Sequence, residues 1–261
     1  MMNAVNILID IGGSGIKVAE YKDKKIGKIE TFNNISSFDE FTKMIKKRQG
    51  TNHLKKIAIS SAGFIDPENG RFIECRCAPY LEGDTVKMLN KEFPFAKVSV
   101  VNDGEAHTRA LLVPGRDVRF GAIHLAFGTA VSFGVINEKG EIIRTCSGGN
   151  WDIGDYLLRT REAPYEVYRK LGAEGLRELE ENFDGDPYRH FGLRVGGLLT
   201  NLAVIFRPRT IGLSGGIIAS QGKRIFAGIQ EEFKTPVSSD KIRFALLEDP
   251  DTVMQGLTTL C

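Results

Sequence analysis

Residues 6–21, NILIDIGGSGIKVAEY, constrain the fold more than any other stretch of the sequence. An apolar run ends in Asp10, a glycine-rich turn follows at residues 12–15, and β-branched residues after the turn favour a second strand over a helix. Phosphate-binding loops of the P-loop and dinucleotide types need a helix directly after their glycines. The stretch therefore predicts a hairpin whose backbone N–H groups can approach phosphate oxygens, with Asp10 placed to hold a hydrated Mg²⁺. The alternative is an ordinary hairpin with a capping Asp.

The same pattern occurs a second time in the chain. In the first copy a charged turn at residues 22–25 leads to a third strand at 26–32; in the second, strands are predicted at 122–127, 131–137 and 141–145. Gly128 and Thr129 form the second tight turn, offset by 116 residues from Gly12. Two copies, each followed by further α/β units, predict a duplicated fold with two halves facing a cleft. Each glycine hairpin would touch the phosphates of one nucleotide from its own side.

Strands and helices alternate through the rest of the chain, which predicts an α/β architecture with parallel strands. Further strands are expected at 56–61, 98–101, 210–213 and 242–247, and extended pieces around a Pro-Glu-Asn-Gly turn within 64–77. Helices are expected at 36–49, 85–93, 105–112, 186–206, 217–233 and 251–260, with helical pieces between 156 and 183.

Composition narrows the functional classes. The chain has 261 residues, 42% hydrophobic and 26% charged, which suits a soluble protein of one large or two modest domains. A net charge of +2 without a basic stripe argues against nucleic-acid binding. No apolar run approaches the roughly 18 residues of a membrane span, and the early first strand argues against a signal peptide. Cys75, Cys77, Cys146 and Cys261 form neither a disulfide scaffold nor a paired zinc motif, so a reducing, cytoplasmic location is expected.

Five motifs, in order along nearly the whole chain, resemble the ROK (repressor, open reading frame, kinase) family of bacterial sugar kinases. They are residues 10–17 for the first phosphate motif, 62–66 with Gly70 for the Pro-Gly-x-Val-Asp segment, Asn102–Asp103 for the catalytic pair, Gly128–Thr129 for the second phosphate motif, and 213–216 for the adenosine motif. The resemblance implies the actin/hexokinase-like (ribonuclease H-like) duplicated fold, with two lobes around a nucleotide cleft. The N-terminal lobe would be 1–112, with the C-terminal helix 250–261 packing back on it, and the C-terminal lobe 113–249.

The resemblance also implies a reaction, the transfer of the γ-phosphoryl group of ATP to a sugar hydroxyl, commonly the 6-hydroxyl of a hexose. Asp103 would be the general base and Asp10 would orient the waters of Mg²⁺. ATP would contact Asp10, Gly12, Gly13, Ser14, Gly128, Thr129, Gly215 and Gly216. The sugar would contact Gly63, Asn102, Asp103, Asp152, Asp155 and Glu166. The alternative for Asp103 is a helix-capping acid after a strand. Lys17 is interpreted as a solvated strand lysine, and His53, His107, His124 and His190 as structural or surface residues.

The sequence departs from the family mainly in the sugar-binding residues. The usual Glu-x-Gly-His element is replaced by residues 151–155, so Glu becomes Asp152 and His becomes Asp155. Tyr80 stands where an Asn usually follows an Ala-Pro pair. The cluster of three Cys that forms the family's zinc motif is absent, so no structural zinc site is expected, and Glu166 is aligned with the Glu that follows that cluster. The phosphate motifs thus match the family pattern more closely than the sugar-binding residues do.

Several functional interpretations stay open beside the ATP-dependent sugar kinase. The short length and missing zinc cluster also resemble polyphosphate-dependent glucokinases, and nothing in the sequence separates the two donors. The altered sugar loop suggests a degenerate member that binds sugar or nucleotide without turnover. A repressor would need a helix-turn-helix before the first strand, where only a few residues precede Asp10. An acetate-kinase-like or chaperone ATPase can share the fold. The resemblance implies a homodimer that closes on a small-molecule sugar, with no nucleic-acid or membrane partner.

Overall fold

The computed structural model describes residues 4–13, 15–116, 118, 121–129, 131–145, 151–152, 172–235 and 241–261. The chain divides into two compact units. The first runs through Pro114 and also takes in Arg144 and Val253–Cys261, while the second comprises Gly115–Ile143 and Trp151–Thr252. Each unit has its own sheet and its own apolar core.

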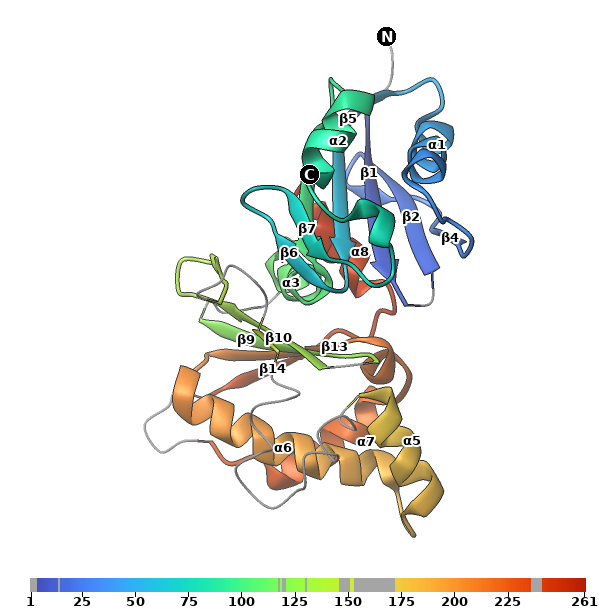
Figure 1. Ribbon diagram of the computed structural model, residues 1–261. Helices are drawn as coiled ribbons and strands as arrows, with labels where there is room; N and C mark the ends of the chain where they lie inside the picture. The colour runs from blue at the N-terminus through green and yellow to red at the C-terminus, as the bar shows by residue number, and fades with distance from the viewer. Residues whose placement is uncertain are drawn as a thin grey trace. The chain divides into compact units, whose positions relative to one another are not determined.

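The first unit is built on a sheet with the strand order β3-β2-β1-β5-β8, and β4 also pairs with β2 (Figure 1). Its strands are β1 (Ala4–Gly12), β2 (Gly15–Lys22), β3 (Lys25–Ile26), β4 (Glu30–Phe32), β5 (His53–Ser61) and β8 (Lys97–Asn102). A separate hairpin joins β6 (Phe64–Asp66) to β7 (Arg71–Glu74). Helices α1 (Phe38–Gln49), α2 (Thr85–Glu92), α3 (Asp103–Arg109) and α8 (Thr252–Thr258) surround the sheet, with 3₁₀ turns at Pro79–Leu81 and Ala110–Leu112.

Side chains of β1 alternate between the two faces of this sheet, as the two-residue period of a strand requires. Val5, Ile7 and Ile9 belong to the core that contains residues of α1 and α2. Leu8 lies in the smaller apolar cluster that contains Ala106 of α3 and residues of α8. Both faces of β1 are therefore covered, which explains why it reads as a continuous apolar run rather than an alternating one.

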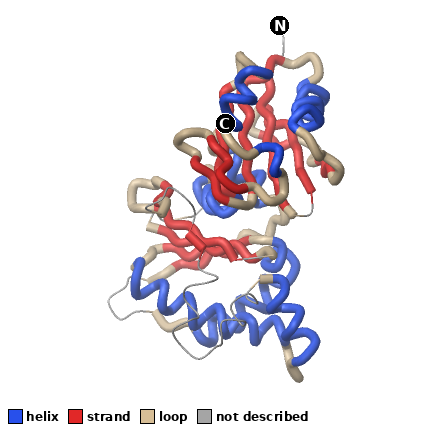
Figure 2. The backbone as a smooth tube through the Cα atoms, viewed as in Figure 1, coloured by secondary structure: helices blue, strands red, loops and turns tan. Residues whose placement is uncertain are grey.

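The second unit repeats this plan with the strand order β11-β10-β9-β13-β14, and β12 pairs with β10. Its strands are β9 (Ala122–Phe127), β10 (Val131–Ile136), β11 (Ile142–Ile143), β12 (Trp151–Asp152), β13 (Thr210–Ser214) and β14 (Arg243–Leu246). Among its described residues, the helices are α5 (Ala173–Asn182), α6 (Pro187–Phe206) and α7 (Gly216–Glu232). Figures 1 and 2 show α6 and α7 side by side along this sheet, and their apolar side chains share its core.

The two sheets confirm the predicted duplication. In each, a central strand pairs antiparallel with the strand after the glycine turn, and parallel with the next long strand of its unit: β1 with β2 and β5, and β9 with β10 and β13. The first turn closes at Gly12 opposite Gly15, and the second at Phe127 opposite Val131. A repeated strand–turn–strand signal in the sequence thus corresponds to a repeated sheet.

Most predicted elements are confirmed, and local chemistry explains the differences. The single strand expected at 26–32 is wrong: β3 and β4 both pair antiparallel with β2, but the register shifts by one residue between the pair Tyr21–Ile26 and the pair Val18–Glu30. The strand expected at 141–145 is limited to β11. α1 begins at Phe38, slightly later than the expected 36, because Ser37 is its N-cap and its Oγ accepts from Glu40 N–H; the Glu40 carboxylate accepts from the backbone N–H and the hydroxyl of Ser36. Asp186 is the N-cap of α6, the helix expected at 186–206, and accepts from the N–H groups of Tyr188 and Arg189.

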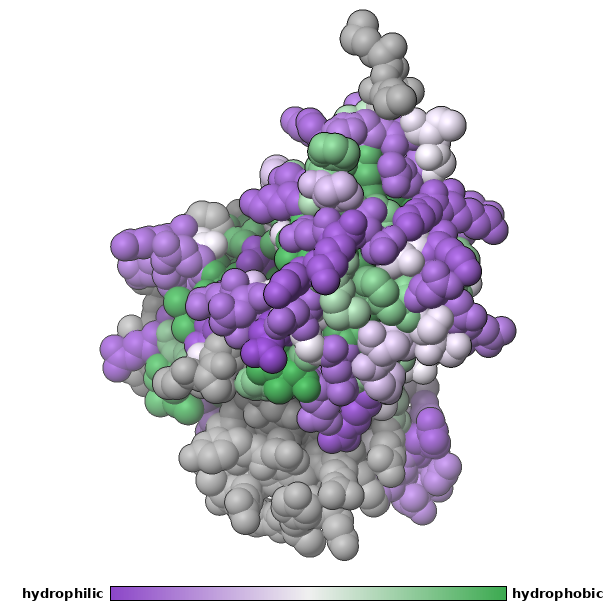
Figure 3. Space-filling view, turned by 45° about the horizontal axis from the view of Figure 1, so that its top comes forward, coloured by the Kyte–Doolittle hydropathy of each residue, from purple (hydrophilic) through white to green (hydrophobic). Residues whose placement is uncertain are grey.

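The described helices include none that is both long and apolar enough to cross a membrane. On the face drawn in Figure 3, hydrophilic side chains cover most of the coloured surface and apolar ones show as smaller areas between them.

Candidate active site

In the first unit, three predicted site elements end at one edge of the sheet. β1, β5 and β8 run parallel, and their carboxyl ends place Ile11 beside Ser61 and Ser61 beside Asn102. Loops after the carboxyl ends of parallel strands are where open α/β sheets bind ligands. Asp10, the turn at Gly12 and Gly13, and the pair Asn102–Asp103 thus share this edge because of the topology alone.

Asp10 is held by a neighbour that the sequence analysis did not single out. Ser60 is the register partner of Asp10 on β5, and its Oγ donates to Asp10 Oδ1 at 2.7 Å. One carboxylate with a fixed orientation suits Mg²⁺ that keeps most of its waters and binds substrate phosphates. Among the described residues, no three His, Cys, Asp or Glu side chains come together as a metal cage. The donor set at Asp10 therefore fits a hydrated ion rather than one enclosed by protein.

The first glycine turn leaves its backbone accessible. Gly13 is exposed, and an added Cβ there would meet nothing within 4 Å. Gly15 has φ +128°, and an added Cβ would overlap the Asn33 side chain, so this position requires glycine. Ser14, a predicted phosphate contact, lies outside the described residues.

Asn102 and Asp103 lie where β8 passes into α3. Asn102 is the N-cap: its Oδ1 accepts from Gly104 N–H at 2.7 Å, and its Nδ2 donates to Gly63 O at 2.6 Å. Gly63 has φ +119°, and an added Cβ would overlap the carbonyl oxygen of Glu74. The structure therefore brings Gly63 and Asn102 together, and gives the Asn102 amide a structural task in addition to the predicted sugar contact.

Asp103 is the first residue of α3, with its carboxylate half-buried. Burial raises the pKa of this carboxyl above its ordinary value, and the Gly104 N–H that donates to Oδ1 at 2.8 Å opposes the rise only in part. A carboxylate whose pKa is moved toward neutrality is better suited to proton abstraction than a solvated one. The capping role that was the alternative for Asp103 belongs mainly to Asn102.

His107 lies one helical turn after Asp103 on α3. Burial and then the positive charge of Lys17 lower its pKa to about 4, so the imidazole is neutral at pH 7. Lys17, interpreted from the sequence as a solvated strand lysine, is half-buried on β2, opposite Asp10. The interpretation of His107 as a structural or surface residue stays a prediction.

In the second unit, the two predicted ATP-binding motifs are neighbours. Gly215 has φ +97°, and an added Cβ would overlap the backbone of Phe127, the residue before Gly128. Gly216 begins the 17-residue helix α7, and an added Cβ there would meet nothing within 4 Å. The N-terminus of α7 therefore lies beside the turn at Gly128 and Thr129, and such a terminus is suited to negative charge.

The carbonyl groups of the turn at Gly128 and Thr129 are in contact with residues at the start of α5. Ala173 N–H, at the start of α5, donates to Gly128 O at 2.9 Å, and an added Cβ on Gly172 would overlap Thr129 O. Thr129 itself is exposed. The contacts with α5 thus fix the turn through its carbonyl groups and do not use its N–H groups.

The predicted sugar ligands of the second unit are described only in part. Asp152 lies on β12, where its backbone pairs with Ser132 of β10, and nothing is described of its side chain. Asp155 and Glu166 lie outside the described residues.

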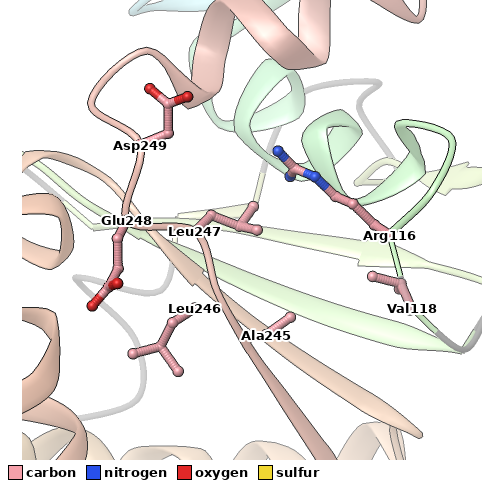
Figure 4. Close-up of a pocket in the computed structure, with 7 residues that line it drawn as sticks. All are labelled: Arg116, Val118, Ala245, Leu246, Leu247, Glu248 and Asp249. Atoms are coloured by element: carbon pink, nitrogen blue, oxygen red, sulfur yellow. The ribbon is translucent and has the colours of Figure 1, made fainter.

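A cavity of about 320 Å³ in the second unit is a different place from these motifs. It is lined by Arg116, Val118, Ala245, Leu246, Leu247, Glu248 and Asp249. Figure 4 shows Arg116 extending toward the side on which Asp249 lies. Burial lowers the pKa of the Arg116 guanidinium, and the Asp249 charge opposes this. The lining residues include none of the predicted ligands, so cavity size alone does not locate the chemistry.

No family model and no curated protein matches the sequence. Solved structures match its fold. A ROK family protein from Streptococcus pneumoniae TIGR4 in complex with sucrose is 18% identical, with a TM-score of 0.78 over 97% of this chain and 96% of that one. A ROK hexokinase from Thermus thermophilus is 14% identical, with a TM-score of 0.73 over 98% and 97%. A ROK family glucokinase from Streptomyces griseus in complex with glucose and AMPPNP is 16% identical, with a TM-score of 0.67 over 98% and 99%.

At these identities the likeness shows the fold. The chain has the actin/hexokinase-like duplicated α/β fold found in ROK kinases, and that prediction is confirmed. The structural likeness agrees with the resemblance carried by the five sequence motifs. A shared fold can host different activities, so function has to be argued from the site.

Proposed function

We propose that this chain is a ROK-type sugar kinase that transfers the γ-phosphoryl group of ATP to a hydroxyl of a hexose or hexose derivative. The observation that carries the proposal is Asp103, a half-buried carboxylate of raised pKa at the carboxyl end of β8, at the same sheet edge as Asp10 and the first glycine turn. Phosphoryl transfer is mostly positioning and charge neutralisation, and it needs few side chains beyond such a base.

Asp103 accepts the proton of the sugar hydroxyl as the hydroxyl oxygen attacks the γ-phosphorus. The bond from that phosphorus to the bridging oxygen of ADP breaks, so the products are the sugar phosphate, ADP and a proton. Backbone N–H groups at Gly12, Gly13, Gly128 and Thr129 hold the phosphates. Mg²⁺, when bound, neutralises phosphate charge, and Asp10 orients its waters.

Further parts of the proposal follow from the sequence resemblance. Ser14, Gly215 and Gly216 belong to the donor site, and Gly63, Asn102, Asp152, Asp155 and Glu166 to the acceptor site. The functional lobes are residues 1–112 with 250–261, and residues 113–249. We expect a cytoplasmic homodimer, without a structural zinc ion and without a nucleic-acid or membrane partner. Inorganic polyphosphate stays open as the donor in place of ATP.

A second candidate is a homologue that binds ligands without turnover. Both ends of the Asn102 amide are already engaged, because Oδ1 accepts from Gly104 N–H and Nδ2 donates to Gly63 O. Together with the shorter acid at Asp152, this favours a weaker acceptor grip than the resemblance implies.

The test is a coupled assay of ADP release against a panel of hexoses, amino sugars and N-acetyl sugars, with polyphosphate as a second donor detected through the sugar phosphate. We expect turnover with at least one sugar, and Asp103→Asn should lower kcat by about 10²- to 10⁴-fold, the usual contribution of a general base. Asp39→Asn is the matched control, because Asp39 is also an acid in the first turn of a helix but is exposed. Sugar binding by calorimetry without turnover would instead support the second candidate.

A further inference from the structure

The helix that carries Asp103 is too short to fix its own position. α3 has seven residues before it tightens into the 3₁₀ turn Ala110–Leu112. Isolated helices of this length are unstable in water, so tertiary contacts must set both the place and the rotation of α3. The direction in which the Asp103 carboxylate points, which we call its aim, therefore depends on the contacts that hold the rest of the helix.

Two contacts set where α3 lies. At its start, Asn102 joins the cap of the helix to Gly63 O. On one side, Gly256 of α8 lies against its backbone so closely that an added Cβ would overlap Ala106 O. These contacts fix the start of the helix and its distance from α8. A third contact lies on the side of the helix opposite Asp103.

That third contact is a buried carboxylate between two arginines. Only 2% of the Glu105 side chain is exposed. Arg144 donates two hydrogen bonds to it from one edge of its guanidinium, from Nε to Oε2 at 2.8 Å and from Nη2 to Oε1 at 2.9 Å. Arg109 donates to Oε1 from Nε at 2.8 Å. The Glu105 contact raises the pKa of Arg144, as a charge-assisted pair should.

The two arginines differ in what they can hold. Arg109 lies one turn further along α3, so it moves with the helix when the helix turns. Arg144 follows β11 and is 39 residues from Glu105, so it belongs to a different segment of the unit. A bidentate ion pair of this kind constrains the orientation of the guanidinium relative to the carboxylate as well as the distance between them. Arg144 is therefore the member of the cluster that resists rotation of α3.

Helical geometry connects the cluster of Glu105, Arg109 and Arg144, which we call the clamp, to Asp103. At about 100° per residue, Glu105 is about 200° from Asp103, on the far side of the helix. A carboxylate about 6 Å from the axis moves about 1 Å when the helix turns by about 10°. A misplacement of about 1 Å at a reacting group can lower the rate by about 10²-fold.

We propose that Arg144, acting through Glu105, is a positioning residue that sets the rotation of α3 and hence the aim of the Asp103 carboxylate. This inference rests on the proposed function, because the base matters only if a hydroxyl is deprotonated. Sequence reasoning had no signal for it, since neither residue belongs to the five motifs.

The surroundings of the clamp offer a way to test it chemically. Arg109 and Arg144 line a cavity of about 330 Å³, together with residues of β8 and of the turn between β6 and β7. Their side chains are 18% and 24% exposed, so solvent reaches them. Arg144→Ala would enlarge this space next to the Glu105 carboxylate, and a small cation such as methylguanidine could enter it.

The kinetic test compares Arg144→Ala with Arg109→Ala and with Arg48→Ala. Arg48 is a matched control, because it is 16% exposed and pairs with Glu20 and Glu30 away from α3. We expect Arg144→Ala to lower kcat by about 10²-fold, the cost of a 1 Å misplacement, while the KM for the donor stays within about twofold. Arg109→Ala should lose less, Arg48→Ala should keep the wild-type rate, and methylguanidine should restore part of the lost kcat of Arg144→Ala only.

Arg144→Lys covers the case in which Arg144→Ala does not fold. It keeps the charge but loses the two-pronged contact, and we expect a loss of about tenfold in kcat. The inference is overturned if folded Arg144→Ala or Arg144→Lys retains the kcat of Arg48→Ala, or if the loss appears in the donor KM instead.

A second readout does not depend on catalysis. His107 lies about 40° from Asp103 around the helix, and its pKa of about 4 reports its burial and the nearby Lys17. If Arg144→Ala lets α3 turn, the His107 pKa measured by NMR should rise toward 6.5, and it should not change in Arg48→Ala. An unchanged value in Arg144→Ala contradicts the clamp even if wild-type protein has no turnover. Absence of wild-type turnover with every sugar and donor contradicts the proposed function alone.

Discussion

Tyr80 gives a stability prediction that runs against the usual effect of removing a polar group. It follows Pro79 in a 3₁₀ turn and packs against the core of the first unit, with its ring centroid 6.3 Å from that of Phe41. Its hydroxyl is shielded from solvent and has no hydrogen-bond partner among the described residues. A buried polar group without a partner costs about 1–3 kcal/mol. Tyr80→Phe should therefore stabilise the protein, by about 1 kcal/mol after the lost contacts of the oxygen are counted.

The alkaline behaviour of the same residue provides an independent magnitude. Burial first, and then the charges of Cys75 and Glu40, raise the pKa of Tyr80 to about 12 from an ordinary 10. The folded protein holds the phenol proton more tightly than the unfolded chain does. This difference in pKa contributes to the free energy of unfolding in full below pH 10, and the contribution is lost as the pH rises toward 12. Two pKa units correspond to at most about 2.7 kcal/mol, and about 0.8 kcal/mol of this should be lost by pH 10.5.

The assay is urea unfolding, with a thermal scan at pH 8, both followed by circular dichroism, for wild type and Tyr80→Phe at pH 8, 9 and 10.5. The variant should be more stable at pH 8, with a Tm higher by about 2–4 °C for each kcal/mol. Its advantage should grow by about 0.8 kcal/mol between pH 9 and 10.5, because other alkaline titrations cancel in the difference. Lower stability of the variant at pH 8, or an advantage that does not change with pH, would refute the view of Tyr80 as a buried, unpartnered phenol.

Three further predictions concern the site. Because burial raises the pKa of Asp103, and a general base must be ionised, kcat/KM should fall on the acid side at a pH above the ordinary carboxyl value of 3.8, and this limb should vanish in the residual activity of Asp103→Asn. Ser60→Ala removes the 2.7 Å donor to Asp10, so the KM for MgATP should rise about three- to tenfold while unfolding free energy changes by about 1 kcal/mol or less. Gly63→Ala should lower the free energy of unfolding in urea by about 1–2 kcal/mol more than Gly83→Ala. Both glycines have positive φ, but of the two only Gly63 lies where an added Cβ would overlap a carbonyl oxygen. Equal losses in the two variants would show that this overlap relaxes without cost.

Much of the fold is predictable because local chemistry and tertiary packing agree. The run of residues 7–9, the turn after Asp10 and their repeat at 122–129 define the two hairpins and, through them, the two sheets. The strand at 26–32 is mispredicted because its pairing with β2 shifts by one residue between β3 and β4, and periodicity over so short a stretch carries little information on register.

The site is predictable only as far as its motifs extend. Asp10 and Asp103 follow buried parallel strands, and the same reasoning applied to Ser60 could have found it, because its strand ends beside that of Asp10. The pairing of Glu105 with Arg144 joins residues that are 39 positions apart, and no periodicity or motif predicts such a contact. The burial of the Tyr80 hydroxyl also depends on packing that one position of sequence does not reveal.

The central claim is that Asp103 takes a proton from a sugar hydroxyl as that hydroxyl attacks the donor phosphate. The most direct measurement is a crystal structure of the full chain with the preferred sugar and a non-hydrolysable ATP analogue. We expect an Asp103 carboxylate oxygen within about 2.6–3.2 Å of one sugar hydroxyl, with that hydroxyl in line with the γ-phosphorus. A sugar bound with Asp103 in contact only with the backbone of α3, and another group next to the reacting hydroxyl, would contradict the claim.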